Sequence, residues 1–281
     1  GIRTEALTAD PIEVAAGGPA WSSDGQAVAF HQFGSGDPSR IYRMDADGGG
    51  RARISDGPAD YRPSWAPGDG AIAFDSGGEG LDRQGIYVNE LEGGGDVRLT
   101  DPTWEAKSCS WRPVGDAIAY ARTEEGGRSM NIHAVDRQGQ PLPQLTHGND
   151  YRFMPSWHPL GTAIAFTFSP GGDWDISDLD IHTIQADGSD ERPVTKHPAP
   201  DWGPVWSPDG TEILFLSDRD GLNELHIVGV DGRGLRRVTF GRFSSYDGYD
   251  WFDPDHQRSV SPVGRRATTW GWLKRLGAPR R

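Results

Sequence analysis

The chain has a single cysteine, Cys109, among 281 residues, so an internal disulfide cannot hold the fold together. No apolar run is long enough to span a bilayer as a helix, and the N-terminus lacks the profile of a signal peptide. Basic residues are scarce relative to acids, and the net charge of −13 argues against a nucleic-acid partner. The compartment stays open between the cytoplasm and a periplasmic or secreted location reached after signal removal.

Glycine, proline and tryptophan are abundant instead, with 39, 21 and 11 copies, whereas apolar residues make up only 35% of the chain. Many short strands joined by tight turns, with large aromatic side chains between sheets, have this composition. We therefore predict an all-β fold.

A unit of about 45 residues recurs along the chain and has three fixed internal distances. Five tryptophans are each followed nine residues later by an aromatic residue, giving the pairs Trp21 and Phe30, Trp65 and Phe74, Trp111 and Tyr120, Trp157 and Phe166, and Trp206 and Phe215. A Tyr or His then precedes a glycine by six residues, and a hydroxyl residue follows that glycine by seven: Ser55, Thr100, Thr146, Thr195 and Thr239. Such a repeat is typical of a β-propeller, and each unit reads as a blade of four strands.

The two ends of the chain predict how the ring of blades closes. Leu7 and Thr8 resemble the end of a fourth strand, and V-S-P-V-G at 260–264 resembles the turn after a first strand. We predict a sixth blade, built from residues 1–8 and about 258–281, in which the N-terminal strand pairs with the C-terminal blade and no sheet edge stays exposed. Trp251 offers a rival register, but the turn after Val260 matches the repeat better. The whole chain, 1–281, is then one six-bladed domain.

The repeat resembles that of the TolB-type propellers, whose unit reads roughly P-x-W-S-P-D-G-x-x-I-A-F, then I-Y, D-G and L-T. W-S-S-D-G at Trp21, W-S-P-D-G at Trp206 and the A-I-A-F strands carry the resemblance, which covers essentially the whole chain. It implies a six-bladed propeller with the Pro-x-Trp strand innermost. The N-terminal α/β domain of TolB itself has no counterpart in these residues. Oligogalacturonate lyases and peptidase-associated propellers share the repeat, so the fold alone does not give the function.

The connections of variable length predict where the function lies. Only the second-to-third and fourth-to-first connections vary, and both emerge on one face of a four-stranded blade. The fourth-to-first segments bring carboxylates, cations and aromatic side chains to the mouth of the central channel. The predicted ligand-binding residues are Tyr61, Arg62, Glu105, Lys107, Tyr151, Arg152, Trp202, Tyr246 and Asp247.

A metal site is a further hypothesis for the same face. Ca²⁺ or another divalent metal takes carboxylate oxygens and imidazole nitrogens as ligands. The candidate ligands are Asp60, Asp150, Asp201, His147 and His197, although no H-x-H or H-E-x-x-H spacing is present. The alternative for Asp60 and Asp201 is a structural role in the turn into the first strand.

Three other histidines and the cysteine have simpler interpretations. His133, His182 and His226 align with Tyr42 and Tyr87, which predicts packing in the third strand. Cys109 lies close to Lys107, and a cation can activate a thiol as a nucleophile, but a small apolar filler in a strand explains it more simply.

These features favour a monomeric binding or interaction module that recognises a small ligand, a protein or a peptide at the channel mouth. The alternative is a metal-dependent hydrolase or lyase that uses the same funnel on a phosphotriester, lactone, ester or uronate substrate. The catalytic residues of such an enzyme are unknown from the sequence, which does not decide whether the chain has turnover.

Overall fold

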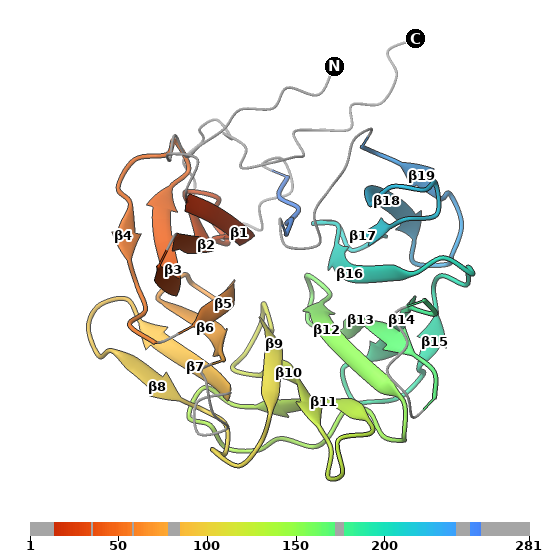
Figure 1. Ribbon diagram of the computed structural model, residues 1–281, viewed down its shortest axis with the longest axis horizontal. Helices are drawn as coiled ribbons and strands as arrows, with labels where there is room; N and C mark the ends of the chain where they lie inside the picture. The colour runs from red at the N-terminus through yellow and green to blue at the C-terminus, as the bar shows by residue number, and fades with distance from the viewer. Residues whose placement is uncertain are drawn as a thin grey trace.

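The computed structural model describes residues 14–34, 36–57, 59–77, 85–171, 177–239 and 248–253. Over these ranges the chain forms nineteen strands and no helix, so no helix here is long and apolar enough to cross a membrane. Five repeat units stand around a common centre, each with its first strand nearest to that centre (Figure 1). The all-β class and the propeller-type arrangement are confirmed.

The first two units are complete four-stranded antiparallel sheets. Their strands are β1 (Val14–Trp21), β2 (Ala27–Gly34), β3 (Asp37–Asp45) and β4 (Ala52–Arg53), followed by β5 (Asp60–Trp65), β6 (Ala71–Ser76), β7 (Gly85–Glu90) and β8 (Asp96–Arg98). The third unit has β9 (Ala106–Trp111), β10 (Ile118–Thr123) and β11 (Met130–Val135).

The last two described units repeat the four-stranded pattern. Their strands are β12 (Tyr151–Trp157), β13 (Ala163–Ser169), β14 (Asp180–Gln185) and β15 (Arg192–Pro193), then β16 (Asp201–Trp206), β17 (Glu212–Ser217), β18 (Glu224–Gly229) and β19 (Arg236–Arg237). One parallel pair, Met130 with Tyr151, joins β11 to β12, so the third and fourth units form a continuous seven-stranded sheet.

The fixed distances of the repeat follow from strand register. In every unit the aromatic residue nine positions after the tryptophan lies directly opposite the Tyr or His of the third strand, as Phe30 does opposite Tyr42 and Tyr120 opposite His133. These rings lie 5.9 and 6.0 Å apart between centroids. The predicted packing role of the third-strand histidines is thus confirmed, and a change in either hairpin length would break the ring pair.

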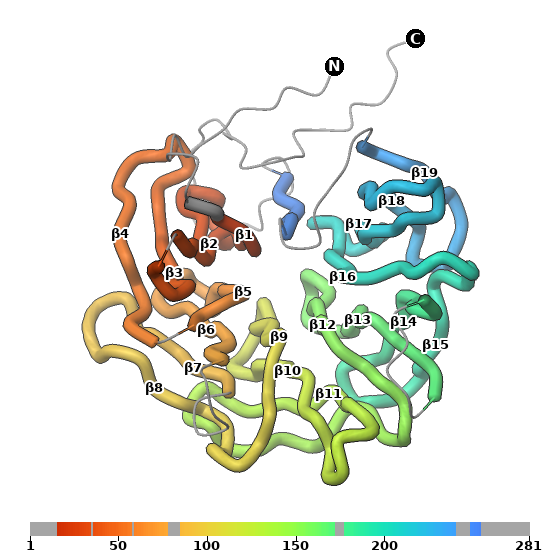
Figure 2. The backbone as a smooth tube through the Cα atoms, viewed as in Figure 1, coloured from red at the N-terminus to blue at the C-terminus, as the bar shows by residue number. Residues whose placement is uncertain are grey.

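The apolar core lies between neighbouring sheets, which follow one another around the ring (Figure 2). Small alanines of one sheet, such as Ala27 and Ala29, face the large residues Trp65, Ile72 and Phe74 of the next. Alternating small and large residues let the sheets approach closely, because each small side chain leaves room for a large neighbour.

The hydroxyl residue that ends each unit has a specific structural role. Its side-chain oxygen accepts a hydrogen bond from the backbone N–H of the third strand, at 2.8 Å from Ile41 to Ser55 and 2.8 Å from Ile132 to Thr146. The same bond forms to Thr100, Thr195 and Thr239. Because these groups are buried, the hydroxyl satisfies an N–H that water cannot reach.

Residues 248–253 continue the series of contacts that links one unit to the next. The N–H of Trp111 donates to Ser64 Oγ at 2.9 Å, and the equivalent N–H of Trp21 donates to Asp250 Oδ2 at 2.8 Å. Ser64 and Asp250 each directly precede a tryptophan, Trp65 and Trp251. The predicted sixth blade itself, 1–8 and 258–281, lies outside the described residues.

Replacing Thr146 by valine tests the hydroxyl bond. Thr146 Oγ1 accepts from Ile132 N and donates to Asn131 Oδ1 at 3.1 Å. We expect Thr146→Val to lower the free energy of unfolding by about 2 kcal/mol, because it leaves a buried N–H unpaired. Thr146→Ser keeps the hydroxyl, as Ser55 does in the first unit, and we expect it to lose less than half as much. Urea denaturation measures both, and an equal loss in the two variants would contradict the role of the bond.

Candidate functional site

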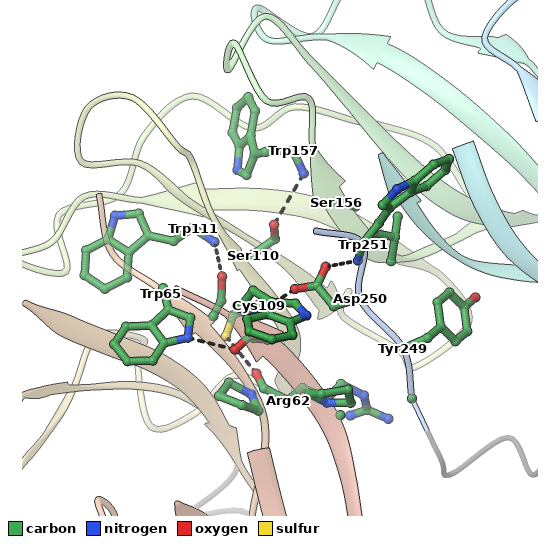
Figure 3. Close-up of a pocket in the computed structure, with 18 of the residues that line it drawn as sticks. Arg62, Trp65, Cys109, Ser110, Trp111, Ser156, Trp157, Tyr249, Asp250 and Trp251 are labelled. Carbon is green, nitrogen blue, oxygen red and sulfur yellow. Dashed lines mark hydrogen bonds between the residues drawn. The ribbon is translucent and has the colours of Figure 1, made fainter. Parts of the chain in front are cut away.

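A cavity of about 1460 Å³ lies at the common centre of the sheets, and the first strands β1, β5, β9, β12 and β16 line it together with residues 248–253. Figure 3 shows Arg62, Cys109, Ser110 and Asp250 around this space. The predicted innermost position of the Pro-x-Trp strand is therefore confirmed.

A backbone bulge recurs in each lining strand three residues before the tryptophan. The residues at this position all have a positive φ: Gly18 (56°), Arg62 (51°), Ser108 (57°), Met154 (53°), Gly203 (66°) and Gly248 (61°). The pairing with the second strand shifts register at the same point in every described unit. Gly248 keeps this spacing to Trp251, which is a second sign that 248–253 extends the series.

Three of these six positions are not glycine, although a left-handed backbone strains any other residue. Arg62, Ser108 and Met154 occupy consecutive units and line the cavity. Such strain costs about 1–3 kcal/mol per residue and persists mainly at functional positions. The side chains are thus placed at the cavity wall at the expense of stability.

Arg62 forms the polar corner of the cavity with residues of the first two sheets. Its Nη1 donates to Asp75 Oδ2 at 2.9 Å, and the arginine side chain is 46% exposed while that of Asp75 is 7% exposed. Burial raises the pKa of Asp75, and Arg62 offsets part of that rise. The buried acid therefore holds the guanidinium in place while leaving half of it open to the cavity.

His31 lies beside Arg62 and is enclosed by aromatic rings. Its ring is 5.3 Å from Tyr61 in an edge-on arrangement and 6.3 Å from Phe33 in a stacked one. Burial lowers the pKa of His31 to about 4, and the charge of Arg62 adds to the effect. The imidazole is therefore neutral at neutral pH.

Cys109 is buried in β9 with its Sγ 3.8 Å from the carbonyl oxygen of Arg62. Burial raises the pKa of the thiol well above its ordinary value, and the nearby Asp75 raises it further. The reactive thiolate is thus disfavoured, which supports the filler interpretation over the nucleophile.

Another part of the cavity wall is formed by the segment 248–253 and β16. The hydroxyl of Tyr249 donates to the carbonyl oxygens of Trp202 and Gly203. Phe252 stacks on Trp21 with 5.1 Å between ring centroids. These contacts attach the segment to both the fifth and the first sheet, between which it lies (Figure 1).

The seven predicted ligand-binding residues that the structure describes fall into two groups. Tyr61, Arg62 and Trp202 line the cavity. The others do not: Glu105 and Lys107 pair with each other at 3.3 Å, and Tyr151 is buried. Arg152 is buried too, bonded to Glu191 at 3.1 Å and to Asp150 at 3.2 Å. Tyr246 and Asp247 lie outside the described residues.

The predicted metal ligands lie apart from one another. Asp60 is fully buried and accepts a 2.5 Å bond from Ser55 Oγ, while Asp201 is bound by Arg219 at 2.6 Å. Within the described ranges no three His, Cys, Asp or Glu side chains converge as a metal site would require. His147 is exposed, and His197 Nδ1 accepts from Ala199 N. The metal hypothesis stays a prediction.

Two residues of the cavity wall, Ser108 and Met154, were not singled out from the sequence. A signal was present, because the position three residues before the tryptophan is glycine in some units and not in others. That alternation marks a backbone conformation that glycine prefers.

A family model described as the TolB beta propeller domain matches residues 3–179 and 149–249. The chain belongs to this family. Among curated relatives, the Tol-Pal system protein TolB of Syntrophus aciditrophicus is 36% identical over 63 residues, which are 21% of this chain and 14% of that protein. An uncharacterised protein of Agrobacterium fabrum is 34% identical over 74 residues, 26% of this chain and 24% of its own length. The matched segments thus span a small part of these relatives.

Solved structures share the TolB-type fold. A provisionally assigned TolB from Agrobacterium tumefaciens superposes with a TM-score of 0.69 at 21% identity, over 86% of this chain and 87% of that one. TolB from Acinetobacter baumannii gives 0.66 at 20% identity, over 81% and 55%. An oligogalacturonate lyase in complex with manganese gives 0.59 at 16% identity, over 83% and 68%. At such identities the likeness shows the fold alone.

Glycine substitutions test the strain in the TolB-type ring. We expect Ser108→Gly to raise the free energy of unfolding by up to about 1 kcal/mol, because glycine adopts a positive φ without strain. The matched variant Ser156→Gly, two residues after Met154 in β12, changes an ordinary strand residue, and we expect it to lower stability by about 0.5–1 kcal/mol. Denaturation of both variants measures the difference, and a destabilised Ser108→Gly would show that the backbone is unstrained.

The buried carboxyl group of Asp250 predicts that the stability of the protein depends on pH, because this group lies where residues 248–253 contact the first unit. Burial raises the pKa of Asp250 from 3.8 to about 6, although the N–H groups of Trp21 and Trp251 favour its ionised form. Because the folded protein holds this proton more tightly than the unfolded chain, ionisation lowers stability as the pH rises from about 4 to 6.

The test is Asp250→Ser, which supplies the acceptor that Ser64 supplies elsewhere. When the pH rises from 4.5 to 7.5, we expect the free energy of unfolding of the variant to increase by about 1–2 kcal/mol relative to that of the unmodified chain. This range allows for the partial exposure of the residue. Denaturation at the two pH values measures this change. A stability difference that is the same at both pH values would contradict it.

Proposed function

We propose that the chain is a binding module that recognises an extended peptide segment of a protein partner at the central cavity. The observation that carries the proposal is the strained set Arg62, Ser108 and Met154, three consecutive non-glycine residues held in a left-handed backbone at the cavity wall. Strain retained in three neighbouring units supports a function for the side chains it positions.

The size and chemistry of the cavity support a peptide over a small molecule. Small-molecule pockets usually enclose about 300–1,000 Å³, and this cavity is about 1460 Å³. Its described wall combines the aromatic residues Tyr61, Trp202 and Phe33 with six charged residues, five of them aspartates. Aromatic side chains contribute large contact area at protein interfaces. A curated relative is named as a Tol-Pal system protein, which agrees with a role in protein assembly.

We also infer that the propeller has six blades and that residues 248–253 contain the first strand of the sixth. Two independent features support this: the Asp250 acceptor for Trp21 N, and the positive φ of Gly248. Closure through this strand would leave no open sheet edge between the first and fifth units.

The alternative function is a metal-dependent hydrolase or lyase that uses the same cavity. The fold likeness to a manganese-containing lyase keeps this alternative in view, since TolB-type propellers serve more than one chemistry. A bound Ca²⁺ or other divalent metal, found by mass spectrometry of the purified protein, would favour it.

Panning a phage-displayed library of random dodecapeptides on the full chain tests the binding module. We expect selected peptides whose affinity falls at least about tenfold in Phe33→Ser, since burying an aromatic ring at an interface contributes 1–2 kcal/mol or more. Phe33 is 39% exposed and lines the cavity.

Leu222→Ser is the matched control, because Leu222 is 41% exposed and does not line the cavity. We expect it to bind the selected peptides like the unmodified chain. Equal loss in both variants would place the binding surface elsewhere, and a library that yields no specific peptide would refute the proposal.

A further inference from the structure

We propose that His31, Tyr61 and Arg62 form a subsite for an acidic side chain, Asp or Glu, of the bound peptide. The inference rests on the proposed peptide-binding function and specifies the ligand residue that this corner of the cavity selects. Its basis is the combination of one half-exposed cation, one unpartnered imidazole nitrogen and an aromatic enclosure.

Arg62 is the only Lys or Arg among the described residues that line the cavity. A guanidinium carries five N–H donors in a planar fork that matches a carboxylate. The hydrogen bond to Asp75 uses Nη1, and the side chain is 46% exposed, so donors face the cavity. The ion pair and the fixed left-handed backbone hold the fork in one place, which reduces the entropy lost on binding.

His31 supplies a second polar group at the same corner. Its residue is 7% exposed, and its Nδ1 is buried with no hydrogen-bond partner among the described residues. Native structures rarely leave such an atom unsatisfied, and in the proposed subsite a bound carboxylate supplies the missing partner once the ring shifts toward the cavity. A neutral imidazole can donate one N–H to a carboxylate oxygen.

Gly18 packs directly against this nitrogen and makes room for the ring. It occupies the left-handed position of the first unit, equivalent to Arg62 of the second, and a Cβ there would lie 2.8 Å from His31 Nδ1. A side chain at this position would cover or displace the imidazole. The glycine in one unit therefore leaves room for His31 beside the arginine of the next unit, which charges this corner.

The carboxylates of the cavity wall would not all repel a bound acid to the same extent, because some of them already accept hydrogen bonds. Asp69 accepts the N–H and hydroxyl of Ser23 at 2.8 and 2.7 Å, and Asp250 accepts the N–H of Trp21. These carboxylates are occupied by backbone groups of the tight turns and of the junction. Asp24, Asp37 and Asp253 also line the wall, so a preference for basic peptides is the competing outcome that an experiment must separate.

The test uses the same dodecapeptide library, panned in parallel on the unmodified chain, Arg62→Gln and Arg43→Gln. Arg43 is the matched control: it is 40% exposed and pairs with Asp45 at 3.8 Å, but it does not line the cavity. We expect Asp or Glu at one fixed position of the peptides selected by the unmodified chain and by Arg43→Gln. Arg62→Gln should still select peptides, without that acid.

Synthetic versions of one selected peptide give the magnitude. Changing its acid to the amide, Asp to Asn or Glu to Gln, should weaken binding about tenfold or more to the unmodified chain and less than about twofold to Arg62→Gln. In addition, the ¹⁵N resonance of His31 Nδ1 should shift with the acidic peptide and not with the amide.

Each outcome decides between the two proposals. Peptides without an acid, or with Lys or Arg in its place, would refute the subsite and leave the binding module standing. An acid whose effect survives Arg62→Gln would also refute it. Failure to select any peptide would refute the binding module and the subsite together.

Discussion

Each sheet of this protein depends on the next one to bury its apolar face. A four-stranded unit of this size cannot enclose a core alone, so stability arises where one sheet packs on its neighbour. The tryptophan that ends each first strand is the centre of that contact: Trp65 packs against Ala27 and Ala29, and its indole N–H donates to the carbonyl of Ala20. The fixed spacing of the repeat keeps this contact in register around the ring.

Sequence spacing predicted the parts of the fold that this constraint controls. The distance of nine residues between tryptophan and aromatic residue places Phe30 opposite Tyr42, and the hydroxyl at the end of the unit satisfies the N–H of Ile41. Both features are recognisable because they require a residue type at a position. The register that we propose for a sixth unit was harder to recognise from the sequence, because the turn motif after Val260 matches the repeat better than the one after Trp251. The contact that favours Trp251 uses Asp250, where other units have serine, so residue type concealed an equivalent hydrogen bond.

The candidate site was only partly predictable for a related reason. Variable connection length pointed to the segments at the channel mouth, and three residues predicted there, Tyr61, Arg62 and Trp202, line the cavity from strands β5 and β16. Tyr151 and Arg152 come from the equivalent segment of another unit, but both side chains are buried, and Arg152 is bonded to Glu191. A polar residue near the start of a first strand can thus line the cavity or pair with neighbouring residues of its own unit. Residue type alone does not distinguish these two roles. Backbone angle does separate them at Arg62, Ser108 and Met154, whose own residue types do not reveal the positive φ; only the glycines at the equivalent positions of other units indicate it.

The same bulge that opens the cavity explains how one scaffold can carry different binding specificities. The six left-handed positions have nearly the same φ, from 51° to 66°, whatever residue occupies them. A change of residue there alters the chemistry of the cavity wall without altering the strand pairing behind it. Glycine at this position adds no side chain to the cavity wall. A longer residue adds a side chain in a fixed place, at a modest cost in backbone strain. In this chain the arginine lies beside the glycine that makes room for His31, so the asymmetry of the ring itself creates a basic corner on a wall whose other described charged residues are acids.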